Sequence, residues 1–143
     1  MKTLRKYLFT LSIPLLTFAL YNCENSDDVN INANISINEG PENGDINGDF
    51  TGNGGDHTGT YQWPNNLSTA NYNADITASA PSSFNMIIQD ADGNTVLDKS
   101  LLGGTESDSF SGVTMSGTPG TWSVTITLID FKGDGSFSIS AGN

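Results

Sequence analysis

The most constraining feature of this 143-residue chain is a strict alternation of apolar and polar side chains close to its C-terminus. The apolar members of the run, at every second position, are Trp122, Val124, Ile126 and Leu128, and threonine or serine stands between them. A period of two matches a half-buried strand and cannot form the apolar stripe of a helix. Because no segment after residue 22 has a helical period, the sequence predicts an all-β fold with Trp122 in its core.

Two further segments between Thr60 and the C-terminus carry strand-like patterns. One of them ends at Pro81, and its alternating apolar residues are Ala74, Ile76, Ala78 and Ala80. The other covers residues 109–116, and its apolar residues are Phe110, Val113 and Met115. Gly112 interrupts the alternation of this second run and indicates a β-bulge.

Two hairpin turns are predicted between strands of this part of the chain. Asp92-Gly93 lies between two apolar runs and is the dipeptide that tight hairpins prefer, because glycine adopts a positive φ without strain. The glycine-rich residues 132–135 predict a second turn, before a last strand with Phe137 and Ile139. Seven to eight short strands spaced in this way predict a small antiparallel β-sandwich, jelly-roll or immunoglobulin-like.

Residues 29–38 show another strict alternation, in which Val, Ile and Ala take every second position and Asn or Ser stands between them. This pattern predicts a strand with one polar face, although asparagine is a poor strand former. The number of asparagines favours a place at the edge of a sheet.

Residues 39–59 form a different kind of segment, because seven of the 21 are glycine. Ile46 and Phe50 are its only large apolar residues, which is too little surface to offset the entropy lost on ordering. Composition therefore predicts a flexible acidic linker between the strand at 29–38 and a β domain at 60–143.

The linker also has some features of a calcium loop. Oxygen-bearing side chains recur at every second position from Asp49, at Thr51 and Asn53, and Gly54 follows. However, Thr60 stands where such a loop needs a bidentate glutamate. A linker without a metal is the favoured interpretation, and no cofactor is expected.

A second calcium-like spacing occurs at Asp90, Asp92 and Asn94. Here the glycine of the calcium motif is replaced by a threonine and its glutamate by a leucine, whereas a hairpin turn accounts for each residue. We therefore expect Gly93→Ala to destabilise the fold more than Asp90→Ala does.

The first 22 residues have the three parts of an export signal. Lys2, Arg5 and Lys6 precede an apolar run from Tyr7 to Leu20, which is too short to cross a bilayer. A buried core helix is the alternative for this run. The basic flank and the position favour a signal peptide, and residues 1–22 are left out of the fold.

The residues that follow resemble the lipobox of bacterial lipoproteins, in which a leucine stands three positions before an acylated cysteine. Leu20 and Cys23 match this motif, while Tyr21 and Asn22 are larger than the residues that the family prefers. The resemblance implies that Cys23 carries a lipid and becomes the first residue of the mature chain. The alternative is a plain secreted protein cut near Ala19.

An acidic patch directly after Cys23 extends the resemblance. Its residues are Glu24, Ser26, Asp27 and Asp28. In lipoproteins of certain Gram-negative bacteria, a similar patch directs the protein to the cell surface, which implies an outer-membrane location here. A simple solvated tether is the alternative interpretation.

The charge of the chain limits its partners. From Cys23 onward the 121 residues contain two lysines and 16 acidic residues, so the formal charge is −14. Such a surface repels phosphate backbones and excludes nucleic acid as a partner. The membrane, through the lipid, and an outer-membrane protein or a glycan remain as partners.

Residues 116–140 resemble the C-terminal part of small exported jelly-roll modules, such as bacterial pre-peptidase C-terminal domains. The shared features are a Pro-Gly turn, a strand that carries a tryptophan, and a glycine-rich turn before the last strand. This resemblance covers about a fifth of the mature chain, and it implies an accessory module.

Candidate catalytic residues are few. His57 is the only histidine and is expected on an exposed loop, without the partners that a zinc site or a nucleophile needs. The acidic residues of the predicted hairpin turns are Asp90, Asp92, Asp130 and Asp134. Since aspartate favours turns for backbone reasons, these residues give little support to a secreted hydrolase.

Binding is the better-supported class of function. Tyr61, Trp63 and Tyr72 lie in an Asn-rich stretch without an alternating pattern, and exposed aromatic rings beside amides suit sugars or peptides. The alternative is that Trp63 covers one end of the sandwich. Asp108-Ser109-Phe110 also resembles a three-residue O-glycosylation motif of some bacteria.

These observations favour a non-catalytic, surface-exposed lipoprotein that serves as a binding or accessory subunit of a membrane assembly. A carbohydrate-binding module that uses Trp63 is the second possibility, and a secreted hydrolase is the third. The expected organisation is a signal peptide at 1–22, an anchor and tether at 23–28, a strand and linker at 29–59, and the β domain at 60–143.

Overall fold

A computed structural model describes residues 31–40 and 44–142 of the chain. Its strands are β1 (Ala33–Glu39), β2 (Ile46–Asn65), β3 (Ala70–Ala78), β4 (Ser83–Gln89), β5 (Thr95–Leu102), β6 (Ser109–Val113) and β7 (Gly120–Ala141). The described residues include no helix, and hence none that could cross a membrane. The prediction of an all-β fold is confirmed. The predicted signal peptide, Cys23 and the acidic patch lie outside the described residues.

All strand pairs are antiparallel, and they form one continuous hydrogen-bonded network. The main path runs in the order β1-β2-β7-β3-β6, and β4 joins it by pairing with β7 and with β5. The two longest strands, β2 and β7, lie at the centre and pair along almost their whole lengths. Each therefore has different neighbours near its two ends.

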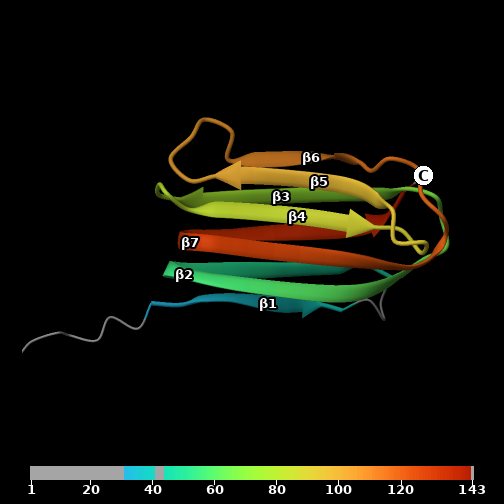
Figure 1. The fold of residues 1–143 in the computed structure, drawn as a ribbon, viewed down its shortest axis with the longest axis horizontal. Helices are drawn as coiled ribbons and strands as arrows, with labels where there is room; N and C mark the ends of the chain where they lie inside the picture. Colours follow the sequence, from blue (N-terminus) through green and yellow to red (C-terminus); the bar gives the residue numbers. More distant parts are fainter. Residues whose placement is uncertain (1–30, 41–43, 143) are drawn as a thin grey trace, which may run out of the picture.

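This network folds over on itself because β2 and β7 both bend near their midpoints. The register of the pair shifts on either side of Gly55, and Asp130 adopts a positive φ of 47° at the same level. A bulge increases local twist and lets a strand pair turn a corner. Figure 1 shows β2 and β7 each running twice through the molecule, once in each layer.

The result is a two-layered sandwich. One layer contains β1, residues 46–53 of β2, residues 131–141 of β7, β3 and β6, in that order. The other contains residues 57–65 of β2, residues 120–129 of β7, β4 and β5. If β1 is left out and each half of β2 and β7 is counted as a separate strand, the strand order in the two layers is that of a jelly roll. Of the two predicted kinds of sandwich, the structure is therefore the jelly roll and not the immunoglobulin-like one.

The core lies between the two layers and is rich in aromatic rings. Phe50 of one layer stacks on Phe84 of the other, with ring centroids 4.8 Å apart. In the second layer Trp63 and Trp122 are cross-strand neighbours, and their rings meet edge to face at 6.0 Å. Both indoles are fully buried, which confirms the prediction for Trp122.

The prediction of a flexible linker at 39–59 is wrong from Ile46 onward, because these residues form most of β2. Composition misleads here because glycines of the paired strands allow close approach of rings and of neighbouring backbone. A Cβ on Gly135 would be 2.5 Å from the ring of Phe50, its cross-strand neighbour, and one on Gly48 would be 3.0 Å from Phe137. The same Cβ atoms would also overlap the carbonyl oxygen of Asp75 and lie 2.6 Å from that of Ser36, so each glycine lets both an aromatic ring and a neighbouring strand come close.

Two predicted local features of the later strands are also wrong. Gly112 causes no bulge, since β3 and β6 pair without a register shift. Instead a Cβ on Gly112 would come within 2.8 Å of the Tyr72 hydroxyl, so this glycine too accommodates a ring. Residues 132–135 form no hairpin turn, because β7 bends and continues. Gly133 has a φ of 151°, and a Cβ there would overlap the carbonyl oxygen of Thr77.

Other predictions are confirmed. The alternation at 29–38 matches β1, which begins at Ala33 and forms the edge of its layer, as the asparagines indicated. The hairpin at Asp92-Gly93 joins β4 to β5, and Gly93 has a φ of 82°. The alternating run that ends before Pro81 is β3, although Ala80 lies beyond the strand.

Candidate functional site

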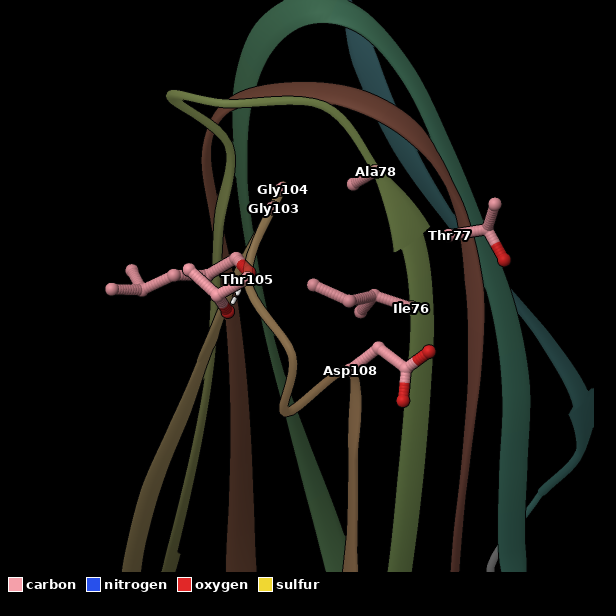
Figure 2. A pocket seen from close by; sticks show the side chains of 8 residues that line it. Ile76, Thr77, Ala78, Gly103, Gly104, Thr105 and Asp108 are labelled. Carbon is pink, nitrogen blue, oxygen red and sulfur yellow. Dashed lines mark hydrogen bonds between the residues drawn. The ribbon is translucent and has the colours of Figure 1, made fainter.

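A pocket of about 190 Å³ lies at the end of β3, beside the loop that joins β5 to β6 (Figure 2). Its lining residues are Ile76, Thr77, Ala78, Leu102, Gly103, Gly104, Thr105 and Asp108. The pocket is small, at the size of a side chain or a sugar fragment rather than of a cofactor.

Backbone hydrogen bonds fix the loop beside the pocket. The N–H groups of Gly103 and Gly104 donate to the carbonyl oxygens of Ser82 and Ala78, at 2.8 and 2.9 Å. At the other end of the loop, the N–H of Ile76 donates to the carbonyl oxygen of Asp108 at 2.8 Å. The loop is therefore tied to β3 on both sides of the pocket.

Glycine is needed at the start of this loop, at positions 103 and 104. A Cβ on Gly103 would be 2.5 Å from the carbonyl oxygen of Ser79, and Gly104 has a φ of 73°. These two residues have no side chains to fill the pocket. The hollow is a consequence of how closely the loop approaches the turn between β3 and β4.

The lining of the pocket combines apolar side chains with a few polar groups. The side chains of Ile76 and Ala78 point from β3 toward the loop, whereas that of Thr77 points to the opposite side (Figure 2). Asp108 provides the one carboxylate of the lining, and Thr105 provides a hydroxyl that donates to the carbonyl oxygen of Leu102 at 2.7 Å. Acid–base chemistry needs a second positioned group, and the lining has none.

Asp90 has a structural role that the sequence did not reveal. Its carboxylate accepts hydrogen bonds from the N–H groups of Asp92, Asn94 and Thr118, at 3.0, 2.8 and 2.9 Å. The Asn94 side-chain amide also donates to it, at 3.2 Å. The N–H of Thr118 and the donors of the turn lower the pKa of the Asp90 carboxyl, although burial opposes this effect.

These contacts change the expected order of the two turn variants. Asp90 is only 6 % exposed, and it connects the β4–β5 hairpin to the segment that precedes β7. Gly93, by contrast, is exposed, and a Cβ added there would meet no atom within 4 Å. Removal of Asp90 leaves several N–H donors without an acceptor, so we now expect Asp90→Ala to destabilise the fold more than Gly93→Ala.

No group of three or more His, Cys, Asp or Glu residues among the described residues is arranged to hold a metal ion. Asp49, Thr51 and Asn53 lie in strand β2, where alternate side chains spread along one face and do not surround a point. Asp49 accepts a hydrogen bond from the Asn38 side-chain amide at 2.7 Å.

His57 is not on an exposed loop, as was expected, but in β2 directly after the bend, where it is half-buried opposite Leu128. Asp130 and Asp134 lie in the bent strand β7 and not in a hairpin turn. Asp92 accepts a hydrogen bond from the Thr118 hydroxyl at 2.7 Å, so it supports the same turn as Asp90.

The predicted aromatic binding cluster of Tyr61, Trp63 and Tyr72 is not formed. Trp63 is fully buried, and its indole N–H donates to the carbonyl oxygen of Gly44 at 3.0 Å. Tyr72 is 8 % exposed and packs edge to face against Phe110. Tyr61 is half-buried, and burial raises the pKa of its hydroxyl. The alternative, in which Trp63 covers one end of the sandwich, agrees with its burial.

Asp108 and Ser109 of the O-glycosylation-like motif are exposed, whereas Phe110 is half-buried. Ser109 is the first residue of β6, an edge strand of its layer. The motif therefore lies next to the pocket, at a position that a modifying enzyme could reach.

One surface was missed in the sequence because its β2 part was assigned to a linker and a loop. Residues 57–65 of β2, residues 120–129 of β7 and β4 carry hydroxyl and amide side chains on their outer face. The cross-strand pairs Thr58–Thr127 and Thr60–Thr125 form hydroxyl hydrogen bonds of 3.4 and 3.0 Å. The alternation of Thr58, Thr60 and Gln62 was the available signal.

A comparison with models of protein families gives no match to this chain. A search of curated proteins gives no match either.

Proposed function

We propose that the protein is an exported, lipid-anchored and non-catalytic binding module that serves as an accessory subunit at the outer membrane. The anchor part of this proposal depends on the short apolar run, Leu20 and Cys23. The binding part depends on the sandwich, which presents polar faces and a small pocket.

The non-catalytic assignment is supported by the structural roles of the polar side chains among the described residues. The buried carboxylate, Asp90, accepts hydrogen bonds from a turn, and the pocket contains a single carboxylate without a partner for proton transfer. A site of this kind can hold a ligand but has no nucleophile and base within reach of each other.

The anchor is tested by fractionation of cells that express the full chain. Cys23→Ser is expected to move the protein from the membrane fraction to the soluble fraction, because it removes the only sulfur to which a lipid can be attached. Ser68→Ala, an exposed substitution, is the matched control and should remain in the membrane fraction. Membrane retention of Cys23→Ser, and an unmodified N-terminal mass in the wild type, would contradict the proposal.

The surface location is tested separately, with protease added to whole cells. Replacement of Asp27 and Asp28 by Ala should leave acylation intact and protect the protein from cleavage. A control with Glu106 and Asp134 replaced by Ala removes the same charge from exposed positions of the sandwich. Equal cleavage of the wild type, the patch variant and the control would show that the acidic patch is only a tether.

The carbohydrate-binding alternative loses its central residue, because a fully buried Trp63 has no free face on which a sugar ring could stack. Glycan binding through this residue is therefore not proposed.

A further inference from the structure

The two layers of the sandwich have four outer edges, and three of them carry features that oppose the addition of another strand. Edge strands expose unpaired N–H and C=O groups, and proteins protect them with charges, bulges or short length. In β5, Lys99 lies between the buried residues Leu97 and Leu101 on the inward face, yet it is exposed. β6 is only five residues long, and β1 has a register shift between Ile37 and Glu39.

The fourth edge, formed by residues 57–65 of β2, has no Asp, Glu, Lys or Arg side chain and no bulge, and its one protective feature is Pro64 near its end. In the part of the chain that the structure describes, these residues pair with β7 on one side, and no strand pairs with them on the other. β1 pairs only with the earlier half of β2, as far as Gly52. No charged side chain lies between Thr58 and Asn65, and the register is regular from His57 onward. We call the side of residues 57–65 that faces away from β7 the open edge.

Pro64 indicates which backbone groups face the open edge. Proline has no N–H, so within a sheet it occurs where its nitrogen points away from the neighbouring strand. Since alternate residues direct their N–H groups to opposite sides, those of Thr58, Thr60 and Gln62 point in the same direction as the nitrogen of Pro64. Three successive backbone N–H donors, one at every second residue, are therefore available at this edge.

Charge favours this part of the surface for an encounter between two copies of the chain. The segment from Cys23 onward has a formal charge of −14, which opposes self-association over most of the surface. The open edge and the adjoining outer face of β4 and residues 120–129 of β7 carry no charged side chain. Two copies can approach along this strip with the least repulsion.

The sequence of the open edge is also complementary to itself. In an antiparallel pair with its two-fold axis at Thr60, that residue lies opposite its own copy, and Thr58 lies opposite Gln62. Gly59 then lies opposite Tyr61, on the inward side. In each copy the backbone N–H groups of Thr58, Thr60 and Gln62 donate across the open edge, and their C=O groups accept. About six backbone hydrogen bonds can therefore form before Pro64 ends the ladder.

We propose that two copies of this chain pair antiparallel through residues 58–62 of β2, joining their β2-β7-β4-β5 layers into one continuous sheet. The occupant of the open edge is thus a second copy, and the pair is a two-fold symmetric dimer. The dimer does not depend on the lipid anchor, and it brings two uncharged outer faces together as one surface.

The pairing is tested with a cysteine at the predicted two-fold axis. Thr60→Cys, in the full acylated chain in mild detergent, is expected to give a covalent dimer with a short bis-maleimide, because directly opposed side chains lie about 5 Å apart. Ser138→Cys, exposed on the outer face of the other layer, is the matched control and should remain monomeric. Monomers from both variants, or equal yields of dimer from both, would overturn the proposal.

A second variant tests the same interface without cross-linking. Thr60→Lys places two like charges opposite each other at the axis, and it should weaken self-association at least tenfold in sedimentation equilibrium. Ser138→Lys adds the same charge elsewhere and should leave the dissociation constant unchanged. Thr60 is exposed, so both variants should melt close to the wild type. A monomeric wild type, or an equal effect of both lysines, would contradict the dimer.

Discussion

The two halves of β2 have the same central neighbour but opposite positions in the sandwich. Residues 46–53 lie between β7 and β1, so both of their sides are paired, whereas residues 57–65 are paired with β7 alone. The earlier half carries the acidic residue Asp49 on its outer face, and the later half carries Thr58 and Thr60. One strand is therefore an interior strand in one layer and an uncharged edge in the other.

The bend decides which side chains each half of the strand directs to the core and to solvent. Before the bend the even-numbered residues face the core, as Phe50 does, and after it the odd-numbered residues do, as Trp63 does. The extra residue at Gly54 causes this switch. It directs Trp63 inward and leaves the threonines outside.

The largest effect is expected from the core residues of the two halves. Phe50→Ala and Trp63→Ala should each lower the free energy of unfolding by about 3–5 kcal/mol, because each removes a fully buried ring. Urea denaturation measures the free energy of unfolding of both variants. As a control, Thr58→Ala on the outer face should change this free energy by less than about 0.5 kcal/mol. A small loss for Trp63→Ala alone would mean that the later half is not packed as described.

The next effect concerns the bend that separates the halves. Gly133→Ala should lower the free energy of unfolding by about 3 kcal/mol, because the added Cβ overlaps the Thr77 carbonyl oxygen at a positive φ. Gly40→Ala is the matched control, since open space surrounds that position. Equal stability of the two variants would show that the bend does not need glycine at 133.

Asp90 supports only the layer that contains the later half of β2. Asp90→Ala is expected to cost more stability than Gly93→Ala, and hydrogen exchange should increase first in β4, β5 and the segment before β7. The thermal midpoints of the two variants give the order directly. A higher midpoint for Asp90→Ala would restore the order that the sequence predicts.

The same carboxylate gives the fold a pH dependence. Hydrogen bonds from the N–H of Thr118 and from the turn lower the pKa of Asp90 in the folded chain, below about 3.9 for an unperturbed aspartate. The stabilisation is therefore fully present above about pH 4, and it is lost as the pH falls through the lowered pKa. Asp90→Asn should show a flatter loss of stability below pH 4, and an identical acid profile would contradict this role.

The smallest of these effects is expected for Gly93→Ala, at about 1 kcal/mol, because the residue is exposed and the strain comes only from its φ of 82°. The thermal midpoint should not depend on calcium in the wild type or in either turn variant. A midpoint that rises with micromolar calcium, and does so only when Asp90 is present, would restore the metal interpretation of the turn.

Much of the fold follows from periodicity alone. The alternation at 121–128 and around Asp92-Gly93 predicts the strands and the hairpin, because buried faces and tight turns leave local signals. The alternation at 29–38 likewise predicts an edge strand. These features depend on neighbours in sequence.

The features that the sequence did not predict depend on distant contacts. Gly48, Gly112 and Gly135 are predicted from the sequence as part of a linker, a bulge and a turn, but each lies opposite an aromatic residue on another strand. The role of Asp90 depends on Thr118, 28 residues away. The burial of Trp63 agrees with the interpretation that it covers one end of the sandwich. The open edge follows from the bend, for which the local sequence gives only a cluster of glycines.

Amide hydrogen exchange of the full acylated chain can distinguish the two halves of β2. If two copies pair through the open edge, the amides of Thr58, Thr60 and Gln62 exchange more slowly as protein concentration rises, while those of residues 46–53 do not change. Pairing through the open edge predicts this contrast within one strand. Exchange at Thr58, Thr60 and Gln62 that is fast at every concentration would contradict it.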